Sequence, residues 1–101
     1  MKIDLSTNTK YLVRNSSTFN SGLKRVYKQG KDLEKLKKVI LEIANGNILG
    51  EKYKDHLLSN SKHYKNCREC HIEPDWLLVY RIDNDELILL LIDTGSHSDL
   101  F

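Results

Sequence analysis

The chain lacks the long apolar segments that membrane insertion and secretion need. Among its 101 residues no run of about 20 apolar residues occurs, and the first residues carry no apolar stretch of a signal peptide. A chain of this length can bury one compact core and no second one. We therefore expect a single domain over residues 1–101 in the cytoplasm, with its active site on the surface. The polar residues 1–9 are expected to form a weakly ordered arm.

Cysteine and methionine are also scarce, which limits the cofactors that the chain could carry. Its two cysteines, Cys67 and Cys70, lie in a Cys-Arg-Glu-Cys-His segment that matches a haem c attachment site and half of a zinc site. Covalent haem needs an exported protein and usually a second axial ligand, yet the one methionine is Met1. In a strand the two thiols would point to opposite faces and could not share a metal. We expect reduced, partly buried cysteines and no metal or cofactor.

Positive charge is concentrated in the first two thirds of the chain. Residues 1–65 hold 14 Lys and Arg against 6 Asp and Glu, whereas residues 66–101 hold 2 against 8. The basic part is the expected dock for a polyanion such as RNA. A lysine-rich helix can equally be a solvated face, and charge alone does not decide between the two.

Two amphipathic helices are predicted in the basic part, after a short strand at residues 11–14. The first runs from N-cap candidates at residues 16–18 to about Gln29 and ends at Gly30. The second is capped by Asp32 and stops at the Asn-Gly-Asn segment 45–47. Its apolar positions form one continuous stripe at helical spacing, made by Leu33, Leu36, Val39, Ile40 and Ile43.

Three strands are predicted after a long loop over residues 48–62, in which periodicity fails and which is a candidate functional loop. We place the strands at about 64–72, 76–82 and 86–93. Their connections are too short for anything but antiparallel neighbours. The last strand is apolar on both faces, which predicts a central position.

These elements predict an α+β fold with the order β-α-α-β-β-β. The expected sheet is mainly antiparallel and twisted, with an αα-hairpin packed on it. The hairpin is expected to return the chain to its starting end. The first strand would then be antiparallel to the next strand if the two were neighbours.

Histidine and carboxylate side chains gather at two places in the acidic part. His71 and Asp75 flank Pro74, which forces a turn, and His97 lies between turn residues shortly before Phe101. Cleavage of an RNA phosphodiester needs a base for the 2′-OH, an acid for the 5′-oxygen and cations for the transition state. Imidazoles transfer protons near neutral pH, so this chemistry requires no metal. Further candidates are the imidazoles of His56 and His63, and the phosphate clamps Lys52, Lys54, Arg68 and Arg81.

Each candidate also has a purely structural interpretation. A histidine beside a turn is often only a surface residue, and Trp76 could be core. The ring of Phe101 either docks on the protein or stacks on a base.

Three separated blocks of the sequence closely resemble the YafQ branch of RelE-type bacterial toxins, and the resemblance covers roughly residues 11–101. The blocks occur in the order of that family and are Tyr53-Lys54-Asp55-His56-x-Leu58, residues 68–80 from Arg68 to Tyr80, and residues 94–101 from Thr94 to Phe101. The resemblance implies a toxin of a type II toxin–antitoxin system. It would cut mRNA in the A site of the 70S ribosome and be inhibited by a cognate antitoxin, expected to be a DNA-binding protein of ribbon-helix-helix type.

The resemblance also assigns roles to individual residues. It implies catalytic roles for His56, His71, Asp75 and His97, with Asp75 or His71 as the base and His97 as the acid. Phe101 would contact a base of the RNA, and Trp76 would support the site and belong to the RNA-binding set with Lys52, Lys54, Arg68 and Arg81.

Asp93 departs from the family pattern, because many relatives carry Arg directly before the Thr-Gly-x-His segment. A carboxylate there is expected to repel a phosphate, so that Asp93→Arg would increase RNA cleavage. The same residue motivates an alternative function, a toxin-like fold that binds its partners but has lost catalysis. A third alternative, a related toxin that acts on DNA gyrase, is disfavoured because blocking a topoisomerase needs no proton-transfer groups.

Overall fold

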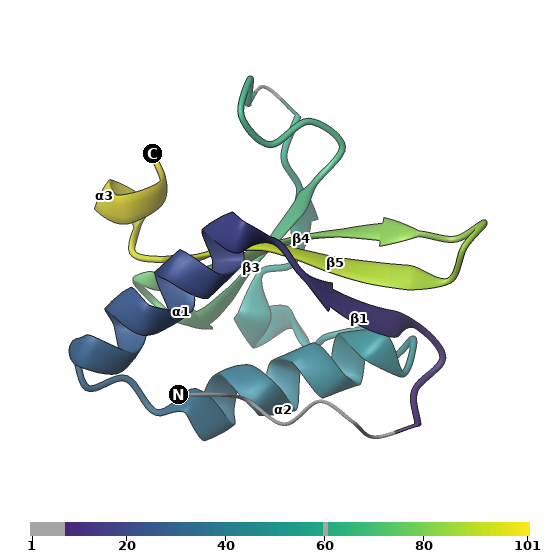
Figure 1. The fold of residues 1–101 in the computed structure, drawn as a ribbon, viewed down its shortest axis with the longest axis horizontal. Helices are drawn as coiled ribbons and strands as arrows, with labels where there is room; N and C mark the ends of the chain where they lie inside the picture. The colour runs from purple at the N-terminus through teal and green to yellow at the C-terminus, as the bar shows by residue number, and fades with distance from the viewer. Residues whose placement is uncertain (1–7, 60) are drawn as a thin grey trace.

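The computed structural model describes residues 8–59 and 61–101 and has two helices packed on one face of a five-stranded sheet (Figure 1). The strand order is β1-β5-β4-β3-β2. The elements in chain order are β1 (Leu12–Asn15), α1 (Ser17–Lys28), α2 (Leu33–Ala44), the 3-10 helix η1 (Glu51–Tyr53), β2 (His56–Leu57), β3 (Arg68–Glu73), β4 (Trp76–Asp83), β5 (Ile88–Gly95) and α3 (His97–Leu100). The α+β prediction is confirmed. The predicted arm falls mostly on residues 1–7, which lie outside the described residues.

Both predicted helices form, and their ends follow from the capping residues. The Ser16 hydroxyl accepts a hydrogen bond from the Phe19 amide at 3.0 Å and begins α1. Gly30, with a φ of 79°, lies just beyond the end of this helix, where a left-handed residue satisfies the last carbonyls. The Asp32 carboxylate accepts from the Glu34 amide at 3.0 Å and begins α2. The predicted apolar stripe of α2 faces the sheet.

The sheet combines antiparallel and parallel neighbours. Strands β3, β4 and β5 are antiparallel, and β5 lies inside the sheet, as predicted. The first strand is not a neighbour of the next one, because β1 pairs with β5 in parallel, with Leu12 opposite Ile88. Two reversals, at the β3–β4 and β4–β5 turns, give β5 the direction of β3, so β1 and β3 run the same way. Helix α2 ends beside the start of β1, where the Tyr11 amide donates to the Ala44 carbonyl at 2.9 Å, so the helical pair does return the chain to its starting end as expected.

Four short features differ from the prediction. Helix η1 and strand β2 lie inside the predicted loop, and both are too short to produce a readable period. Strand β3 begins at Arg68 rather than near Tyr64, because Asn66 has a φ of 60° and interrupts the extended chain. Helix α3 was not predicted, although its capping box is a readable signal.

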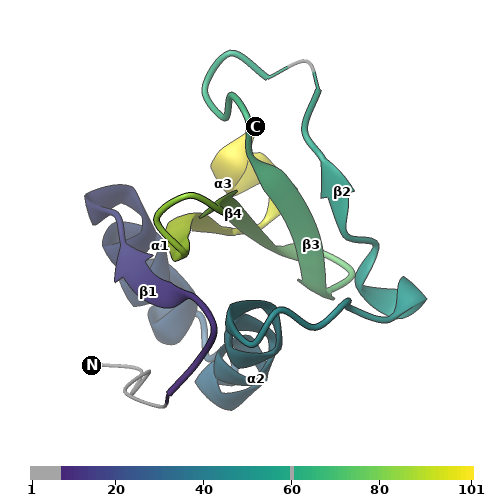
Figure 2. The ribbon, with the colours of Figure 1, turned by 90° about the vertical axis from the view of Figure 1, so that its right-hand side faces the viewer.

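The sheet separates two hydrophobic cores. Figure 2 shows the sheet with the helical pair α1–α2 beside it. The larger core lies between the sheet and the helical pair α1–α2 and contains Cys70 and Trp76. The smaller core lies on the opposite face, where Tyr64, Cys67 and Leu100 pack with the β4 residues Leu77 and Val79. The cysteines thus face opposite sides, as expected, although both are fully buried rather than partly buried. Within the described ranges no helix has the length and apolar character to span a membrane.

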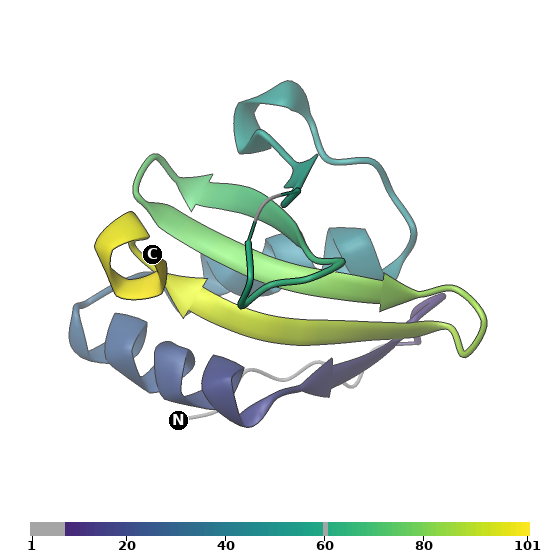
Figure 3. The ribbon, with the colours of Figure 1, turned by 90° about the horizontal axis from the view of Figure 1, so that it is seen from above.

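Helix α1 lies against the end of β5 that leads into α3, and a glycine makes this contact possible (Figure 3). The Ser16 hydroxyl donates to the Ile92 carbonyl at 2.8 Å, and Arg25 Nη2 donates to the Thr94 carbonyl at 2.8 Å. Between them, a Cβ on Gly22 would lie 2.5 Å from the Thr94 oxygen. The backbone of β5 cannot move away easily, because it is paired with β4 on its other side. Gly22 therefore sets how closely α1 approaches this strand.

Gly22→Ala is expected to lower the free energy of unfolding by about 1–3 kcal/mol, the usual cost of overpacking. The added methyl would overlap the Thr94 carbonyl, which outweighs the better helix propensity of alanine, worth about 1 kcal/mol. Urea unfolding monitored by circular dichroism measures the change. Ser21→Ala, at an exposed position of the same helix, is the control and should not destabilise. An equally stable Gly22→Ala protein would contradict this account of the helix–strand contact.

Candidate active site

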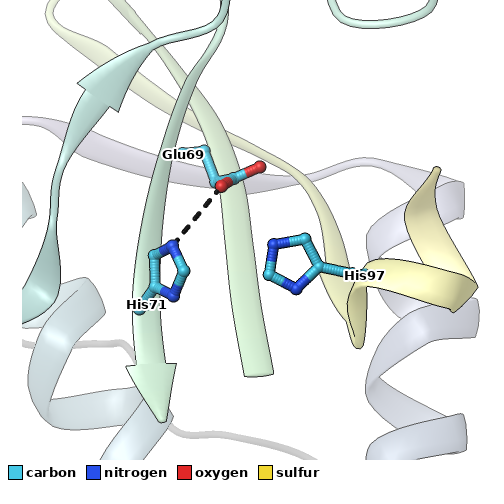
Figure 4. Close-up of side chains that lie close together, drawn as sticks. All are labelled: Glu69, His71 and His97. Atoms are coloured by element: carbon cyan, nitrogen blue, oxygen red, sulfur yellow. Dashed lines mark ion pairs between the residues drawn. The ribbon is translucent and has the colours of Figure 1, made fainter. Parts of the chain in front are cut away.

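Strands β2 and β3 place two imidazoles on either side of a buried carboxylate. Residues of β3 alternate between faces, so Glu69 and His71 point the same way, and His56 of β2 lies directly opposite Glu69. Glu69 Oε1 is 3.7 Å from His56 Nε2 and 3.6 Å from His71 Nε2. Figure 4 shows the carboxylate of Glu69 beside His71. Glu69 is only 4% exposed, so its carboxylate has a fixed position, and at these distances it forms an ion pair with either imidazole when that ring is protonated.

Backbone carbonyls hold the same two rings from the other side. His56 Nδ1 is 2.7 Å from the Lys54 carbonyl, and His71 Nδ1 is 3.2 Å from the Pro74 carbonyl. Because a carbonyl only accepts, Nδ1 carries the hydrogen in each ring and Nε2 faces Glu69. Lys54 adopts a left-handed backbone conformation with a φ of 49°, which is costly for a side chain other than glycine. This conformation forms the turn between η1 and β2.

Helix α3 brings His97 to the same cluster. The helix begins with a capping box, in which the Ser96 hydroxyl accepts from the Asp99 amide and the Asp99 carboxylate accepts from the Ser96 amide. His97 follows immediately, and its ring centroid is 5.7 Å from that of His71. In Figure 4 the ring of His97 reaches from α3 toward Glu69 and His71. An imidazole from β3 and one from the helix that follows β5 thus face one another.

Asp75 orients His97 through two hydrogen bonds to one oxygen. Its Oδ1 accepts from the His97 amide at 2.9 Å and lies 2.9 Å from His97 Nδ1. The backbone and side-chain bonds from His97 lower the pKa of Asp75 below its ordinary value. The ionised carboxylate accepts a hydrogen from Nδ1, which leaves Nε2 of His97 for chemistry. This is the carboxylate–imidazole arrangement that orients a proton donor or acceptor in many enzymes.

Phe101 and Tyr64 form an aromatic wall next to His97. The ring centroids of Tyr64 and Phe101 are 5.6 Å apart with an edge-to-face angle of 75°, and those of His97 and Phe101 are 6.4 Å apart. Phe101 is 60% exposed, so its ring is held by Tyr64 yet stays accessible. The predicted contact between Phe101 and a base fits this position and remains a prediction.

Asp93 does not face a phosphate, and the expectation that it does is wrong. The side chain is 7% exposed, and its oxygens accept from the Tyr64 hydroxyl at 2.9 Å and from the Thr94 amide at 2.8 Å. Arg25 Nη2 of α1 lies 3.7 Å from Asp93 Oδ1. Burial raises the pKa of Asp93, while the contacts with Tyr64, Thr94 and Arg25 act in the opposite direction. Burial and the bond to Asp93 also raise the pKa of Tyr64 to about 12. Asp93 is therefore a structural residue that joins α1, β5 and the loop before β3.

Two residues of the predicted RNA-binding set lie away from the histidine cluster. Trp76 is fully buried, and its Nε1–H donates to Thr94 Oγ1 at 3.0 Å, so it supports the end of β5 and cannot touch RNA. Arg68 lies opposite Tyr80, on the face that carries the helices, and its Nε donates to Asp55 at 3.1 Å. It is therefore on the other side of the sheet from Glu69. Arg81 is exposed and lies two residues beyond Val79, on the face of β4 that also carries Val79 opposite Glu69, so its predicted contact with RNA stays a prediction.

The structure thus brings His56, His71, Asp75 and His97 into one cluster and adds Glu69, which the sequence analysis missed. A carboxylate two residues before a predicted site histidine in a strand was a readable signal for Glu69, because such residues share a face. The distant partners Tyr64 and Arg25 had no signal in the sequence. Lys52 and Lys54 lie on and just after η1 beside this cluster and are exposed.

The comparisons with known proteins agree with this geometry. Residues 11–101 match the family model described as the bacterial toxin of type II toxin–antitoxin system, YafQ. The chain is 37% identical over 87 residues to the mRNA interferase toxin YafQ of Escherichia coli strain B, covering 85% of this chain and 90% of that protein. A metal-bound toxin from Helicobacter pylori has a TM-score of 0.83 and 44% identity, with 90% and 99% of the two chains covered. YafQ in the E. coli DinJ–YafQ complex has a TM-score of 0.81 and 33% identity, with 91% and 98% covered.

The fold and the histidine cluster therefore define a small bacterial toxin of the type II toxin–antitoxin class. Within this class, the chain belongs to the YafQ family.

Asp93→Arg is expected to lower the free energy of unfolding by about 3 kcal/mol, the usual cost of breaking a buried charged pair, and not to increase activity. The new guanidinium would replace the acceptor of Tyr64 and face Arg25 across a short distance. Thermal and urea unfolding measure the change. Asp93→Asn keeps an acceptor for the Tyr64 hydroxyl and should lower the free energy of unfolding by less. Unchanged stability in Asp93→Arg would show that this network does not support the fold.

Proposed function

We propose that the protein is an endoribonuclease that cuts mRNA in the ribosomal A site and is held inactive by a cognate antitoxin. The observation that carries this proposal is the pair of facing imidazoles, His71 and His97, each oriented through Nδ1 by an oxygen acceptor. Such a pair can take one proton and give another on opposite sides of a phosphate. The name of the E. coli relative, an mRNA interferase toxin, supports RNA as the substrate.

In the proposed reaction His71 is the base and His97 the acid. Nε2 of His71 takes the proton of the 2′-OH, and the 2′-oxygen forms a bond to the adjacent phosphorus. The bond from phosphorus to the 5′-oxygen breaks, and that oxygen takes a proton from Nε2 of His97. The products are a 2′,3′-cyclic phosphate and a 5′-OH. Asp75, one of the two candidate bases in the sequence analysis, instead orients His97, because a carboxylate with two donors and a lowered pKa is a weak base.

His56 and the lysines of the η1 region supply positive charge for the transition state in this proposal. His56 shares Glu69 with His71, and Lys52 and Lys54 lie on the adjacent segment. Lysine clamps on phosphoryl groups act as point charges and lower the energy of the extra negative charge. They take the role that the sequence analysis gave partly to Arg68.

The proposed partners are the antitoxin, the 70S ribosome and mRNA, which place the protein in the cytoplasm. The E. coli relative was crystallised as a DinJ–YafQ toxin–antitoxin complex, which supports an antitoxin partner here. A DNA-binding protein of ribbon-helix-helix type remains our expectation for it. The alternative, a binding module without catalysis, loses its motive because Asp93 is a structural residue rather than a defect in the site.

We further propose that cleavage needs no metal, although the site could hold one. Ligand atoms of Glu69, His71 and His97 lie within 4.8 Å of one another, and a donor set of two imidazoles and a carboxylate suits zinc or copper. The H. pylori relative is a metal-bound toxin. A metal ion on these three residues would act as a Lewis acid. It would also occupy the imidazole nitrogens that the proposed proton transfers need.

The expected outcome is that EDTA leaves the cleavage rate unchanged, whereas Zn²⁺ or Cu²⁺ inhibits cleavage. Both ions would bind Nε2 of His71 and His97, the atoms that take and give the protons in the proposed reaction. Single-turnover cleavage of a programmed mRNA on ribosomes measures the rate, with Mg²⁺ restored for ribosome integrity after chelation. Loss of activity with EDTA that only Zn²⁺ or Cu²⁺ restores would contradict metal independence.

His97→Ala is expected to lower the cleavage rate about 100- to 10,000-fold, the usual effect of losing a general acid, and to leave the fold intact. The side chain is 56% exposed, so its packing contributes little. Cleavage on ribosomes gives the rate and circular dichroism checks the fold. The matched control is His63→Ala, an exposed histidine outside the cluster, which should cleave normally. A His97→Ala protein with wild-type activity would remove His97 from the mechanism.

A further inference from the structure

A hollow of about 480 Å³ lies next to His71, between α2, η1 and the β3–β4 turn. Its volume is within the range of about 300–1,000 Å³ that is typical of sites for small organic groups. It is separate from the cluster of His97, Glu69 and His56 and shares only His71 with it. The residues that line it are Lys35, Lys38, Val39, Lys52, Tyr53, Lys54, His71, Ile72, Glu73 and Pro74.

The lining combines an apolar floor with a basic rim. Val39, Tyr53, Ile72 and Pro74 supply aliphatic and aromatic surface, and Val39, Tyr53 and Ile72 also pack on the larger core. The floor is therefore anchored in the body of the protein. Four lysines surround it, from α2 and from the η1 region.

Most of the positive charge of the rim is not neutralised by the protein itself. Lys35 is paired with Glu73 at 2.9 Å, and Glu73 is also 3.4 Å from Lys31. For Lys38, Lys52 and Lys54, no carboxylate of the described ranges lies within ion-pairing distance. The Lys52 ammonium is 5.0 Å from the centroid of the Tyr53 ring, so it stays at the mouth of the hollow. The lysines of the rim can therefore bind an anion.

We propose that this hollow binds one nucleotide of the RNA substrate, next to the bond that is cut. Its base would lie on the floor against Tyr53 and Ile72, and its phosphates would contact Lys38, Lys52 and Lys54. The proposal rests on the proposed nuclease function and names the subsite that selects the flanking base. Unstacked bases stack on aromatic side chains, and lysines bind phosphates. An aromatic floor with a lysine rim therefore fits a nucleotide better than it fits the carboxylate of a peptide.

The position of the hollow indicates the path of the RNA strand across the site. A second, shallower hollow of about 370 Å³ lies on the other side of the cluster, between His56 and Phe101. His71 borders the first hollow and His56 the second, while Glu69 lies between these two rings. An RNA strand would therefore place one base in each hollow and the phosphate between them over the imidazoles.

Binding of a trinucleotide to the intact protein tests this proposal. The probe is triadenylate with 2′-O-methyl groups, which cannot be cleaved, and NMR amide shifts report the site and the dissociation constant. Signals of Tyr53 and Ile72 should shift with those of His71. Tyr53→Ala should weaken binding about tenfold, because stacking on an aromatic ring is worth about that much or more, whereas Tyr53→Phe should bind like wild type. Lys38→Ala tests the rim at an exposed position of α2, and circular dichroism checks that the variant is folded.

Salt dependence separates contact with phosphate from general charge effects. Lys38→Ala should reduce the slope of log affinity against log salt by about 0.7, the value for one phosphate contact on a single strand. Lys24→Ala on α1, an exposed lysine away from the hollow, makes the same change of charge and should leave the slope unchanged.

Three results would overturn the proposal. These are no trinucleotide binding to the wild type, shifts that avoid Tyr53 and Ile72, or wild-type affinity in both Tyr53→Ala and Lys38→Ala. Shifts at these residues with an acidic peptide but not with the trinucleotide would assign the hollow to a protein partner. Cleavage of translated mRNA is measured in parallel. If the wild-type protein cleaves mRNA but the trinucleotide does not bind in the hollow, only the proposed subsite is refuted. If the wild-type protein does not cleave mRNA, the proposed function is refuted.

Discussion

The contact of Arg25 with the end of β5 is the interaction on which the rest of the site depends. Its guanidinium donates to the Thr94 carbonyl, lies 3.7 Å from Asp93 and has its Nε 3.3 Å from an oxygen of Asp99. One side chain of α1 therefore contacts both the last residues of β5 and the capping residue of α3. The Nε is buried without a hydrogen bond of good geometry, so the ion pair with Asp99 is its main compensation. Because His97 follows directly after this junction, the packing of α1 determines where the proposed acid lies.

The site is assembled from two halves that meet over β4. Strands β2 and β3 carry His56, Glu69 and His71 as one rigid row, held by strand pairing. Helix α3 carries His97 and is fixed by its capping box and by Asp75 from the β3–β4 turn. The proposed base His71 and the proposed acid His97 are 26 residues apart in the sequence and are joined through the paired strands β3, β4 and β5. A preorganised pair of this kind avoids the cost of arranging the groups at the moment of reaction.

The sequence predicted the regular elements well and the environment of single side chains poorly. The apolar stripe of α2 and the apolar run of β5 identify their elements because burial imposes a period on many residues at once. No such period marks η1 or β2, which have three and two residues. Sequence blocks also located the histidines and Asp75, since the resemblance relates whole segments. The ion pair of Arg68 with Asp55 on the helical face of the sheet and the burial of Asp93 had no signal in the sequence, because the face of a strand on which a side chain lies depends on register, and register is set by partners far away in the chain. The repulsion predicted at Asp93 was therefore wrong, whereas the RNA contact of Arg68 stays a prediction.

The two cysteines have a practical consequence for work on this protein. Cys67 and Cys70 are buried in cores on opposite faces of the sheet, and burial raises the pKa of both thiols. Neither thiol is then a good nucleophile, and the sheet itself prevents them from meeting. A cysteine introduced at an exposed position, such as Phe101 or Lys38, would react selectively with a maleimide dye, while the two native thiols would stay unlabelled. The wild-type chain is therefore already a suitable background for fluorescence studies of binding to the proposed ribosome partner, without prior removal of its own thiols.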